Sequence, residues 1–360
     1  MAKKNEIHEL YADPSKSAAW AGLRYTNDDK PGYTRRKAGK GYAFLDEKGA
    51  RVTDEKVLER LKALVIPPAW KDVWICKSAK GHLQVTGRDE KGRKQYIYHQ
   101  QWQQARSLTK FGRMIEFGMQ LPKLRERIQQ DINSRKLDRR KVTALVLSLM
   151  DNALIRIGNR HYAKSNKSYG LTTLRDKHVE INGSNIRFSF RGKKGVEHEI
   201  DLEDRRLARL VKKCRDIPGY DLFQYYDESG ERQTLESGDV NEYLHEAMEE
   251  EFTAKDFRTW GGTVKMVECL EAVLEEDPDL NKEKSIKAAV KEVAKGLGNT
   301  PSVCSKYYIH PEVLNLFRED KLLTYLKRHD AGAPQTPFLS GTEELVLNML
   351  QRVAKEKKAS

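Results

Sequence analysis

The sequence predicts an α+β protein in which a small β-rich N-terminal module precedes a larger, mainly α-helical part with one short β-hairpin. Short strand-like runs separated by Gly, Lys and Asp occupy residues 41–98. Helical apolar repeats dominate from about residue 107, and one alternating segment, residues 181–200, interrupts them. We therefore expect two domains, residues 1–105 and 106–360.

In the N-terminal module, residues 1–40 are polar and basic, and we expect an arm with little regular structure. From Gly41 the pattern predicts a strand, a turn at residues 47–49, a second strand, and a helix over residues 54–65 with Thr53 as its N-cap. Strands at residues 73–76, 82–86 and 95–98 complete the module.

Residues 87–98 combine cations, Arg93 among them, with Tyr96 and Tyr98, which share one face of a strand. Arginine and lysine can reach phosphates while phenol edges meet bases or sugars. Taken alone, the segment is more typical of a solvated hairpin.

The larger part has its clearest helices at residues 121–132 and 142–157, and Arg156 lies at the end of the second. Residues 181–190 alternate apolar and polar side chains, turn at residues 191–195 and return through residue 200, which puts Lys193 at a hairpin tip. We expect helices in the remainder, less clearly over residues 221–235, and a last helix over residues 343–359.

One helix, with apolar residues at steps of three and four from Ile286 to Leu297, leads into a turn. Gly298 suits the positive φ of a helix end, and Pro301 prevents the helix from resuming. Asn299 is then a turn former by default. Tyr307 and Tyr308 follow, and in the simplest interpretation one is a core residue and the other a surface residue. A phenol titrates at about pH 10, so it becomes a nucleophile only where cations or a base help it lose its proton.

The formal charge of +13 indicates a polyanionic partner. Residues 1–105 hold 21 Lys and Arg against 13 Asp and Glu, a net +8 of that total. Residues 221–251 hold eleven acids and one basic residue, Arg232, which suits a solvated face turned away from nucleic acid.

The four cysteines are scattered without a C-x-x-C pair, so we expect neither a zinc site nor a disulfide framework. The first residues lack the apolar core of a signal peptide, and Pro67 and Pro68 stop the apolar run near Ala63. A reducing cytoplasm without a membrane anchor fits these features.

Several motifs follow one another in a characteristic order: Ile155–Asn159 with Tyr162, Gly170–His178, Phe190–Lys193, Lys255–Thr259, and Gly298–Ser302 leading to Tyr308. Their residues and order resemble the type IB DNA topoisomerases, specifically the compact poxvirus-like branch found in bacteria. Residues 66–67 and 92–98 also resemble the DNA-clamping cap domain of that family. The resemblance covers nearly the whole chain.

The resemblance implies a C-shaped clamp on double-stranded DNA and catalysis by a monomer in the bacterial nucleoid. Tyr308 would attack a phosphodiester to leave a 3′-phosphotyrosyl bond, with Arg156, Arg258 and Asn299 on the phosphate oxygens and Lys193 as general acid. Arg93, Tyr96, Tyr98 and Tyr162 would contact DNA. No cofactor or metal is implied, and no Walker-type phosphate loop is present in the sequence.

Two departures from the family pattern bear on the site. Most relatives carry His where this chain has Asn299, which keeps a hydrogen-bond donor but removes acid–base chemistry there. The Tyr307-Tyr308 pair leaves the register of the nucleophile open by one, and the family spacing from Asn299 favours Tyr308. We assign no role to His178, Lys194 or His198.

Two alternatives share these residues. A tyrosine recombinase uses the same Arg, Lys, Arg and Tyr roles, but typically carries His-x-x-Arg where this chain has Lys255–Arg258. Recombinases also generally have a helical module where this chain has a β-rich one. A DNA-binding relative without catalysis is disfavoured because usable side chains occupy all five catalytic positions.

Overall fold

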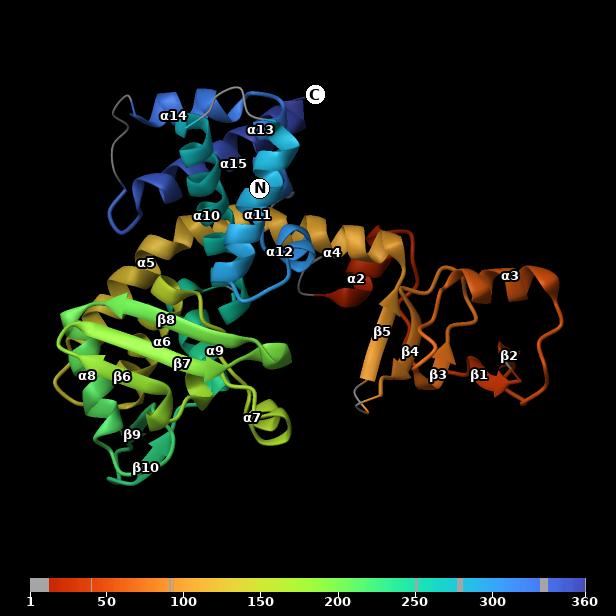
Figure 1. Cartoon of the computed structure of the whole chain (residues 1–360), viewed down its shortest axis with the longest axis horizontal. Helices are drawn as coiled ribbons and strands as arrows, with labels where there is room; N and C mark the ends of the chain where they lie inside the picture. Colours follow the sequence, from red (N-terminus) through yellow and green to blue (C-terminus); the bar gives the residue numbers. More distant parts are fainter. Residues whose placement is uncertain are drawn as a thin grey trace. The chain divides into compact units, whose positions relative to one another are not determined.

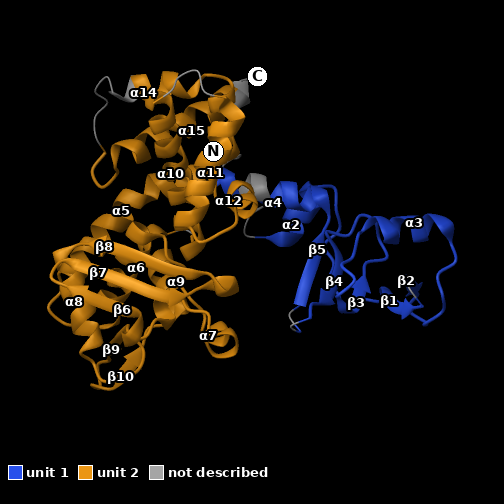
Figure 2. Cartoon of the chain, in the orientation of Figure 1, with its two compact units in different colours: residues 1–113 blue, residues 114–360 orange. Residues whose placement is uncertain are grey.

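The chain forms two compact units, Met1–Arg113 and Met114–Ser360 (Figures 1 and 2). The computed structural model describes residues 13–39, 41–90, 92, 94–249, 252–276, 281–330 and 336–359, without the side chains of residues 107–109, 328–330 and 357–359. The domain boundary expected after residue 105 lies within α4 (Gln100–Gly112), the last helix of the first unit. The α+β class expected from the sequence is confirmed.

The first unit is built on a five-stranded antiparallel sheet with the order β2-β1-β3-β4-β5. Its strands are β1 Tyr33–Ala38, β2 Gly41–Leu45, β3 Lys71–Ile75, β4 Leu83–Arg88 and β5 Lys94–Tyr98. The helices among its described residues are α2 Pro14–Trp20, α3 Glu55–Ala63 and α4.

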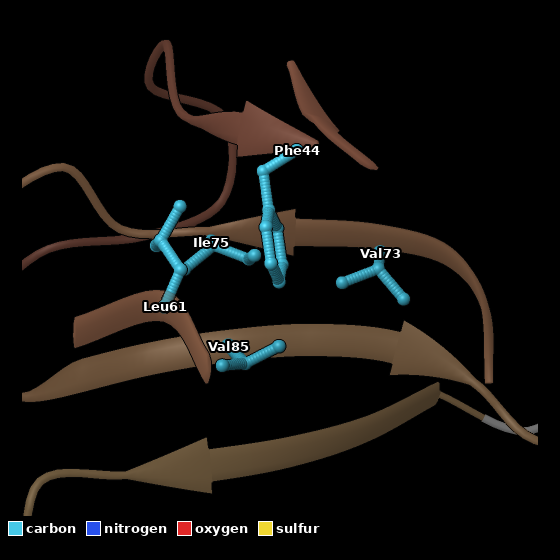
Figure 3. Close-up of a cluster of buried hydrophobic side chains, with 5 residues drawn as sticks. All are labelled: Phe44, Leu61, Val73, Ile75 and Val85. Carbon is cyan, nitrogen blue, oxygen red and sulfur yellow. The ribbon is translucent and has the colours of Figure 1, made fainter. Parts of the chain in front are cut away.

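The core of this sheet is a cluster of five buried apolar side chains (Figure 3). Phe44 comes from β2, Val73 and Ile75 from β3, Val85 from β4, and Leu61 from α3. An amphipathic helix buries its apolar stripe in this way because leaving that stripe in water would cost roughly 1.5–3 kcal/mol per large side chain.

The prediction that residues 1–40 lack regular structure is wrong for the residues described. The carboxylate of Asp13 caps α2 by accepting from Ser15 N at 2.7 Å, and Ala18 of that helix is buried against Trp102. Residues 33–38 form β1, where the Arg35 guanidinium donates to backbone carbonyls between residues 66 and 70. Basic composition did not prevent folding here because the backbone carbonyls supply acceptors for the arginine.

Two smaller expectations for this unit are also wrong. Asp54 rather than Thr53 is the N-cap of α3, since its Oδ1 accepts from Val57 N at 3.0 Å. After the turn at residues 47–49 the expected second strand is only an isolated bridge between Arg51 and Leu45, and β2 pairs with β1 instead.

The second unit is mainly helical and carries two small antiparallel sheets. Its helices are α5 Met114–Ile132, α6 Arg139–Ala153, α7 Arg160–Asn166, α8 Arg205–Arg215, α9 Ser237–Met248, α10 Ala254–Glu276, α11 Lys282–Gly296, α12 Pro301–Tyr307, α13 Pro311–Arg318, α14 Leu322–Asp330 and α15 Gly341–Ala359. Its strands are β6 Val179–Asn182, β7 Asn185–Arg191 and β8 Glu197–Glu203 in one sheet, and β9 Gln224–Tyr226 and β10 Arg232–Thr234 in the other.

The three-stranded sheet confirms the expected hairpin around Lys193, with Phe190 paired to His198. Ile186, Phe188 and Phe190 alternate inward on β7, toward the side covered by α6 and α8 (Figure 1). The run expected as one strand over residues 181–190 is two strands, because the chain reverses at Gly183, whose φ is +62°. The helix expected over residues 343–359 is confirmed as α15.

The helix expected over residues 142–157 instead ends at Ala153. Leu154 adopts a left-handed conformation with φ +50°, and its side chain packs on Gly261 of α10, where a Cβ atom would lie 2.5 Å from Leu154 Cδ2. This contact with another helix ends α6 early, so Arg156 lies in the segment after the helix.

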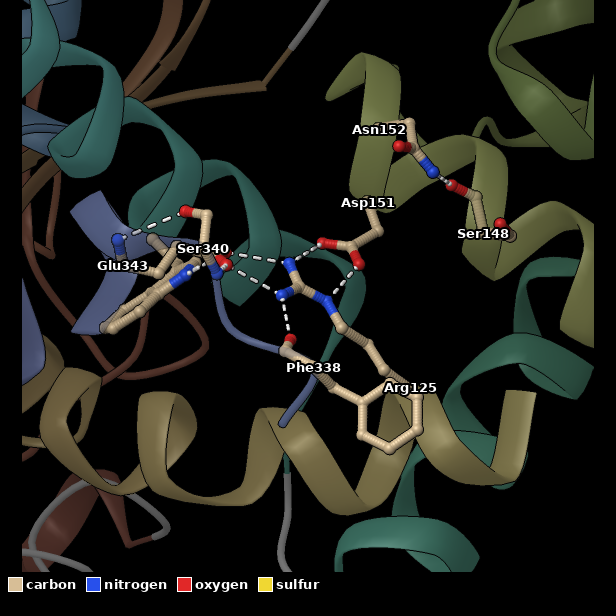
Figure 4. Close-up of polar contacts among 8 residues, drawn as sticks. Arg125, Ser148, Asp151, Asn152, Phe338, Ser340 and Glu343 are labelled. Carbon is tan, nitrogen blue, oxygen red and sulfur yellow. Dashed lines mark hydrogen bonds and ion pairs between the residues drawn. The ribbon is translucent and has the colours of Figure 1, made fainter. Parts of the chain in front are cut away.

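A buried ion network joins α5, α6 and α15 (Figure 4). The guanidinium of Arg125 is bidentate on Asp151 at 2.6 and 3.0 Å and on Glu343 at 2.7 Å for each contact, and it also donates to Phe338 O. Trp260 Nε1 of α10 donates to Glu343 at 3.0 Å. Burial lowers the pKa of Arg125, but these hydrogen bonds raise it by more, so the guanidinium stays charged.

We expect the substitution Arg125→Met to lower the free energy of unfolding of the second unit by about 3–5 kcal/mol, because two largely buried carboxylates lose their counter-charge. Arg127→Met is the matched control, since Arg127 pairs with Asp131 at the surface of the same helix and such pairs contribute about 0–1 kcal/mol. Urea unfolding measures both. Equal, small losses in the two variants would contradict the importance of the network.

Candidate active site

Arg156 is held in an extended segment that packs against a second loop. Its carbonyl accepts from Leu171 N at 2.8 Å, and Thr172 N donates to Ile157 O at 2.7 Å. A Cβ atom at Gly170 would lie 2.5 Å from Arg156 O, so only glycine allows this approach. The backbone of both loops therefore fixes where the Arg156 side chain starts.

Arg258 extends from α10 into the core and is only 4% exposed. Its guanidinium donates to Leu154 O, at the end of α6, and to Leu297 O, at the end of α11, the latter at 2.6 Å. Its Nε has no hydrogen-bond partner among the described residues. Burial, followed by the charge of Arg156, lowers the pKa of Arg258 to about 10, and the side chain remains a cation at neutral pH.

Asn299 lies in the turn after α11, where Gly298 has the positive φ (+57°) expected from the sequence. Its Oδ1 accepts from Arg156 Nη2 at 2.7 Å, and its Nδ2 lies 3.4 Å from Leu297 O. The same carbonyl accepts from Arg258. The turn at residues 297–299 therefore contacts both guanidinium groups, Arg258 through the Leu297 carbonyl and Arg156 through the Asn299 amide.

Tyr308 directly follows α12 as its C-cap and lies beside the two arginines. The Arg258 guanidinium carbon lies 5.2 Å from the centroid of the Tyr308 ring, and the nearby phenol raises the pKa of both Arg156 and Arg258 against the lowering caused by burial. Tyr307 is 46% exposed, with Lys306 Nζ 5.4 Å from its ring centroid. The two tyrosines therefore have different surroundings, and Tyr308 is the one next to the arginines.

Helix α10 holds the backbone of Tyr308 through two small residues. A Cβ atom at Gly262 would lie 2.8 Å from Tyr308 O, so the glycine is what permits this approach. The Thr263 hydroxyl accepts from His310 N at 3.0 Å and lies 3.3 Å from Tyr308 O. Sequence reasoning missed both residues, although the pair Gly261-Gly262 inside a helix is a signal of close packing.

Lys193 lies in the short 3₁₀ turn η3 (Lys193–Gly195) between β7 and β8. Burial and, next, the charge of Arg156 lower the pKa of Lys193, while the Tyr308 phenol opposes that shift. The lysine is therefore within electrostatic reach of both residues, and losing its proton is easier than for a lysine in water.

His198, to which the sequence analysis gave no role, also belongs to this cluster. Its ring is stacked on Phe190 with centroids 5.0 Å apart and an interplanar angle of 12°. Burial, then the charges of Arg156 and Arg258, lower the pKa of His198 from 6.5 to about 4. The imidazole is neutral at physiological pH.

The residues expected to contact DNA are divided between the two units. Tyr96 and Tyr98 of β5 are stacked with centroids 5.9 Å apart; Tyr96 is 48% exposed, while Tyr98 packs against Ala18, Leu23 and Trp102. Tyr162, on α7 of the second unit, is 55% exposed. Arg93 lies outside the described residues.

Among the described residues, no group of three or more His, Cys, Asp and Glu side chains could hold a metal ion. None of the described helices is both long enough and apolar enough to span a membrane.

Comparison with known proteins gives two matching family models. Residues 99–329 match "Eukaryotic DNA topoisomerase I, catalytic core", and residues 41–89 match "Bacterial DNA topoisomerase IB, N-terminal domain". The chain is 32% identical to DNA topoisomerase 1B of Acanthamoeba polyphaga mimivirus over 80% of its own length and 88% of the relative's. It is 25% identical to DNA topoisomerase 1B of Vaccinia virus (strain Western Reserve), over 76% and 86% respectively.

The depressed pKa of His198 has a consequence for acid stability. The folded chain binds this proton less readily than the unfolded chain, so the stability contributed above pH 6.5 is lost as the pH falls from 6.5 toward 4. Between pH 6.5 and 4 we expect the free energy of unfolding to fall less in His198→Asn than in the wild type. The expected difference is about 1–2 kcal/mol, a value reduced because the ring is partly exposed to solvent.

The measurement is urea unfolding at pH 7 and pH 4.5, with His161→Asn as a control at an exposed histidine of the same unit. Parallel pH dependence in the wild type and His198→Asn would contradict the assignment of the shift to His198.

Proposed function

The chain belongs to the type IB DNA topoisomerases, and from this premise we propose that it relaxes supercoiled duplex DNA by cutting and resealing one strand, without ATP or a divalent metal. It is an isomerase that acts on DNA. The observation that best supports the proposed mechanism is that the phenol of a single tyrosine, Tyr308, lies beside two guanidinium groups, close enough to raise the pKa of both Arg156 and Arg258.

In the proposed reaction the phenol oxygen of Tyr308 attacks a phosphorus atom of the DNA backbone while its proton passes to water. The bond from phosphorus to the 5′-oxygen breaks, which leaves a 3′-phosphotyrosyl ester and a 5′-hydroxyl. After the cut strand has rotated, the 5′-hydroxyl attacks the ester and restores both the DNA and the phenol. The energy of the broken bond is kept in the ester, so no nucleotide is consumed.

Arg156, Arg258 and Asn299 would stabilise the charge that develops on the non-bridging oxygens in the transition state. Each such contact contributes on the order of 3 kcal/mol in comparable sites. The hydrogen bonds of Arg258 to two helix-end carbonyls support this role, because they fix the guanidinium before the substrate arrives. Asn299 supplies an amide donor and no titrating group.

Lys193 would donate a proton to the departing 5′-oxygen and take it back on religation. Its lowered pKa supports this role, because an acid works best when its pKa approaches the working pH. The two matching family models, both of topoisomerases, favour this function over a tyrosine recombinase.

We expect Tyr308→Phe to abolish relaxation of a supercoiled plasmid, by at least about 10⁴-fold, while DNA binding is kept, because the variant lacks only the attacking oxygen. Tyr307→Phe is the matched control and should retain activity. The assay contains EDTA and no nucleotide, and gel electrophoresis of the plasmid gives the rate.

Full activity in Tyr308→Phe, or a requirement for Mg²⁺ or ATP in the wild type, would overturn the mechanism. Trapping the covalent complex with denaturant and sequencing the DNA-linked peptide identifies the modified tyrosine directly.

We further propose that residues 1–105 are a DNA-binding cap domain, in which Arg93, Tyr96 and Tyr98 contact the duplex, and that Tyr162 adds a contact from the second unit. The exposure of Tyr96 and the net +8 of this segment support the proposal. One chain would act as a monomer at the bacterial nucleoid, and sedimentation of the protein with a short duplex tests the stoichiometry.

We expect Tyr96→Ala to weaken binding of a short duplex at least about fivefold, equivalent to one hydrogen bond of roughly 1 kcal/mol. Tyr226→Ala is the control, because Tyr226 is similarly exposed (46%) but lies in the acidic segment. Fluorescence anisotropy at fixed salt measures both affinities. Equal affinities for the two variants would contradict a role of Tyr96 in the cap.

A further inference from the structure

His198 lies between two backbone segments that carry site residues. A Cβ atom at Gly192 would lie 2.6 Å from both Cδ2 and Nε2 of His198, and a Cβ atom at Gly298 would lie 2.2 Å from its Cε1. Real Cβ atoms do not approach so closely, so the imidazole occupies the space that a side chain at either position would need. Each glycine leaves room for the ring, and Gly298 in addition has the positive φ of the helix end.

Each glycine directly precedes a residue of the proposed mechanism. Gly192 is followed by Lys193 in the hairpin turn, and Gly298 is followed by Asn299 in the turn after α11. These two turns are far apart in the sequence and belong to different elements, and the imidazole packs on both.

The position of the ring is fixed by the neighbouring strand of the sheet. His198 is paired with Phe190 across β7 and β8, and the two rings are stacked. The hairpin is further tied to the loop before Gly170 by the hydrogen bond from Tyr169 N to Arg191 O at 2.8 Å. The ring therefore touches both turns, meeting Gly192 of the lysine turn through Cδ2 and Nε2 and Gly298 of the asparagine turn mainly through Cε1.

The His198 ring is neutral, which suits a position beside two cations. Arg156 and Arg258 are the charged groups that act on it, and both are cations. A protonated imidazole there would repel them, whereas the neutral ring does not.

We propose that His198 is a positioning residue that sets the distance between the Lys193 turn and the Asn299 turn, so that the lysine ammonium reaches the 5′-oxygen while the amide reaches the non-bridging oxygens. This inference rests on the proposed function. His198 itself neither touches the reacting atoms nor transfers a proton; it acts through Lys193.

The test is a set of plasmid relaxation rates for His198→Ala, Lys193→Ala and the double variant. A displacement of about 1 Å of a catalytic group costs up to roughly 100-fold, so we expect His198→Ala to slow relaxation by about 10- to 100-fold with unchanged DNA affinity. In the Lys193→Ala background the same substitution should change the rate by less than about threefold, because the group that it positions is already absent.

A second pair of variants tests the geometry. Gly192 has φ −94°, which alanine can adopt, so Gly192→Ala adds only a methyl group directed at the ring. We expect Gly192→Ala to slow relaxation on its own but to add nothing in the His198→Ala background, where the space is empty. If His198→Ala does not fold, Gly192→Ala combined with Lys193→Ala takes its place, with the same expectation of non-additivity.

The inference is overturned if His198→Ala or Gly192→Ala relaxes plasmid as fast as the wild type, or if the effects of His198→Ala and Lys193→Ala simply multiply, as a general loss of structure would produce. A wild-type protein that fails to relax plasmid overturns the proposed function first. The wild-type rate therefore distinguishes failure of the proposed function from failure of the positioning role.

Discussion

The arrangement of the second unit depends on one buried cation, the guanidinium of Arg258. Removing a charge from water is costly unless hydrogen-bond acceptors replace the water. Here two carbonyls at the ends of α6 and α11 supply them. Helix ends have unpaired carbonyls and a partial negative charge, so they are favourable partners for a cation. The same interaction that makes the buried charge tolerable brings two helix ends, and the loops that follow them, to one point.

Many helices and strands could be predicted because the spacing of apolar residues along a short segment favours one type of secondary structure. Alternation on β7 and β8 gave the hairpin, and the apolar stripe that ends at Leu297 gave α11 with its turn at Gly298. Where the prediction failed, a distant partner overrode the local signal. α6 stops at Ala153 because Leu154 packs on Gly261, more than a hundred residues later in the chain. The folded basic segment before residue 40 likewise depends on acceptors and apolar partners elsewhere in the first unit.

In the candidate active site, too, some features could be predicted from the sequence and others depend on residues far away in the chain. Sequence order and family resemblance singled out Arg156, Lys193, Arg258, Asn299 and Tyr308, and the structure brings these residues near one another. Local sequence offered no way to separate the surroundings of Tyr307 from those of Tyr308, because that difference comes from α10. His198 was missed for a similar reason: its importance lies in two glycines on other segments, and a histidine in an alternating strand carries no such signal by itself.

The cluster of cations around Tyr308 has a further consequence. Within the described residues, the charges that shift the pKa of Arg156, Lys193 and Arg258 come from other cations and from the tyrosine and cysteine side chains, with no carboxylate among them. In the free protein these three cations therefore repel one another, and the negative charge of a bound phosphate would offset that repulsion. By thermodynamic linkage, a ligand that binds the folded state better than the unfolded state stabilises it. Bound DNA should therefore stabilise the folded second unit as well as serve as its substrate. The free energy of unfolding of this unit should rise with the concentration of DNA.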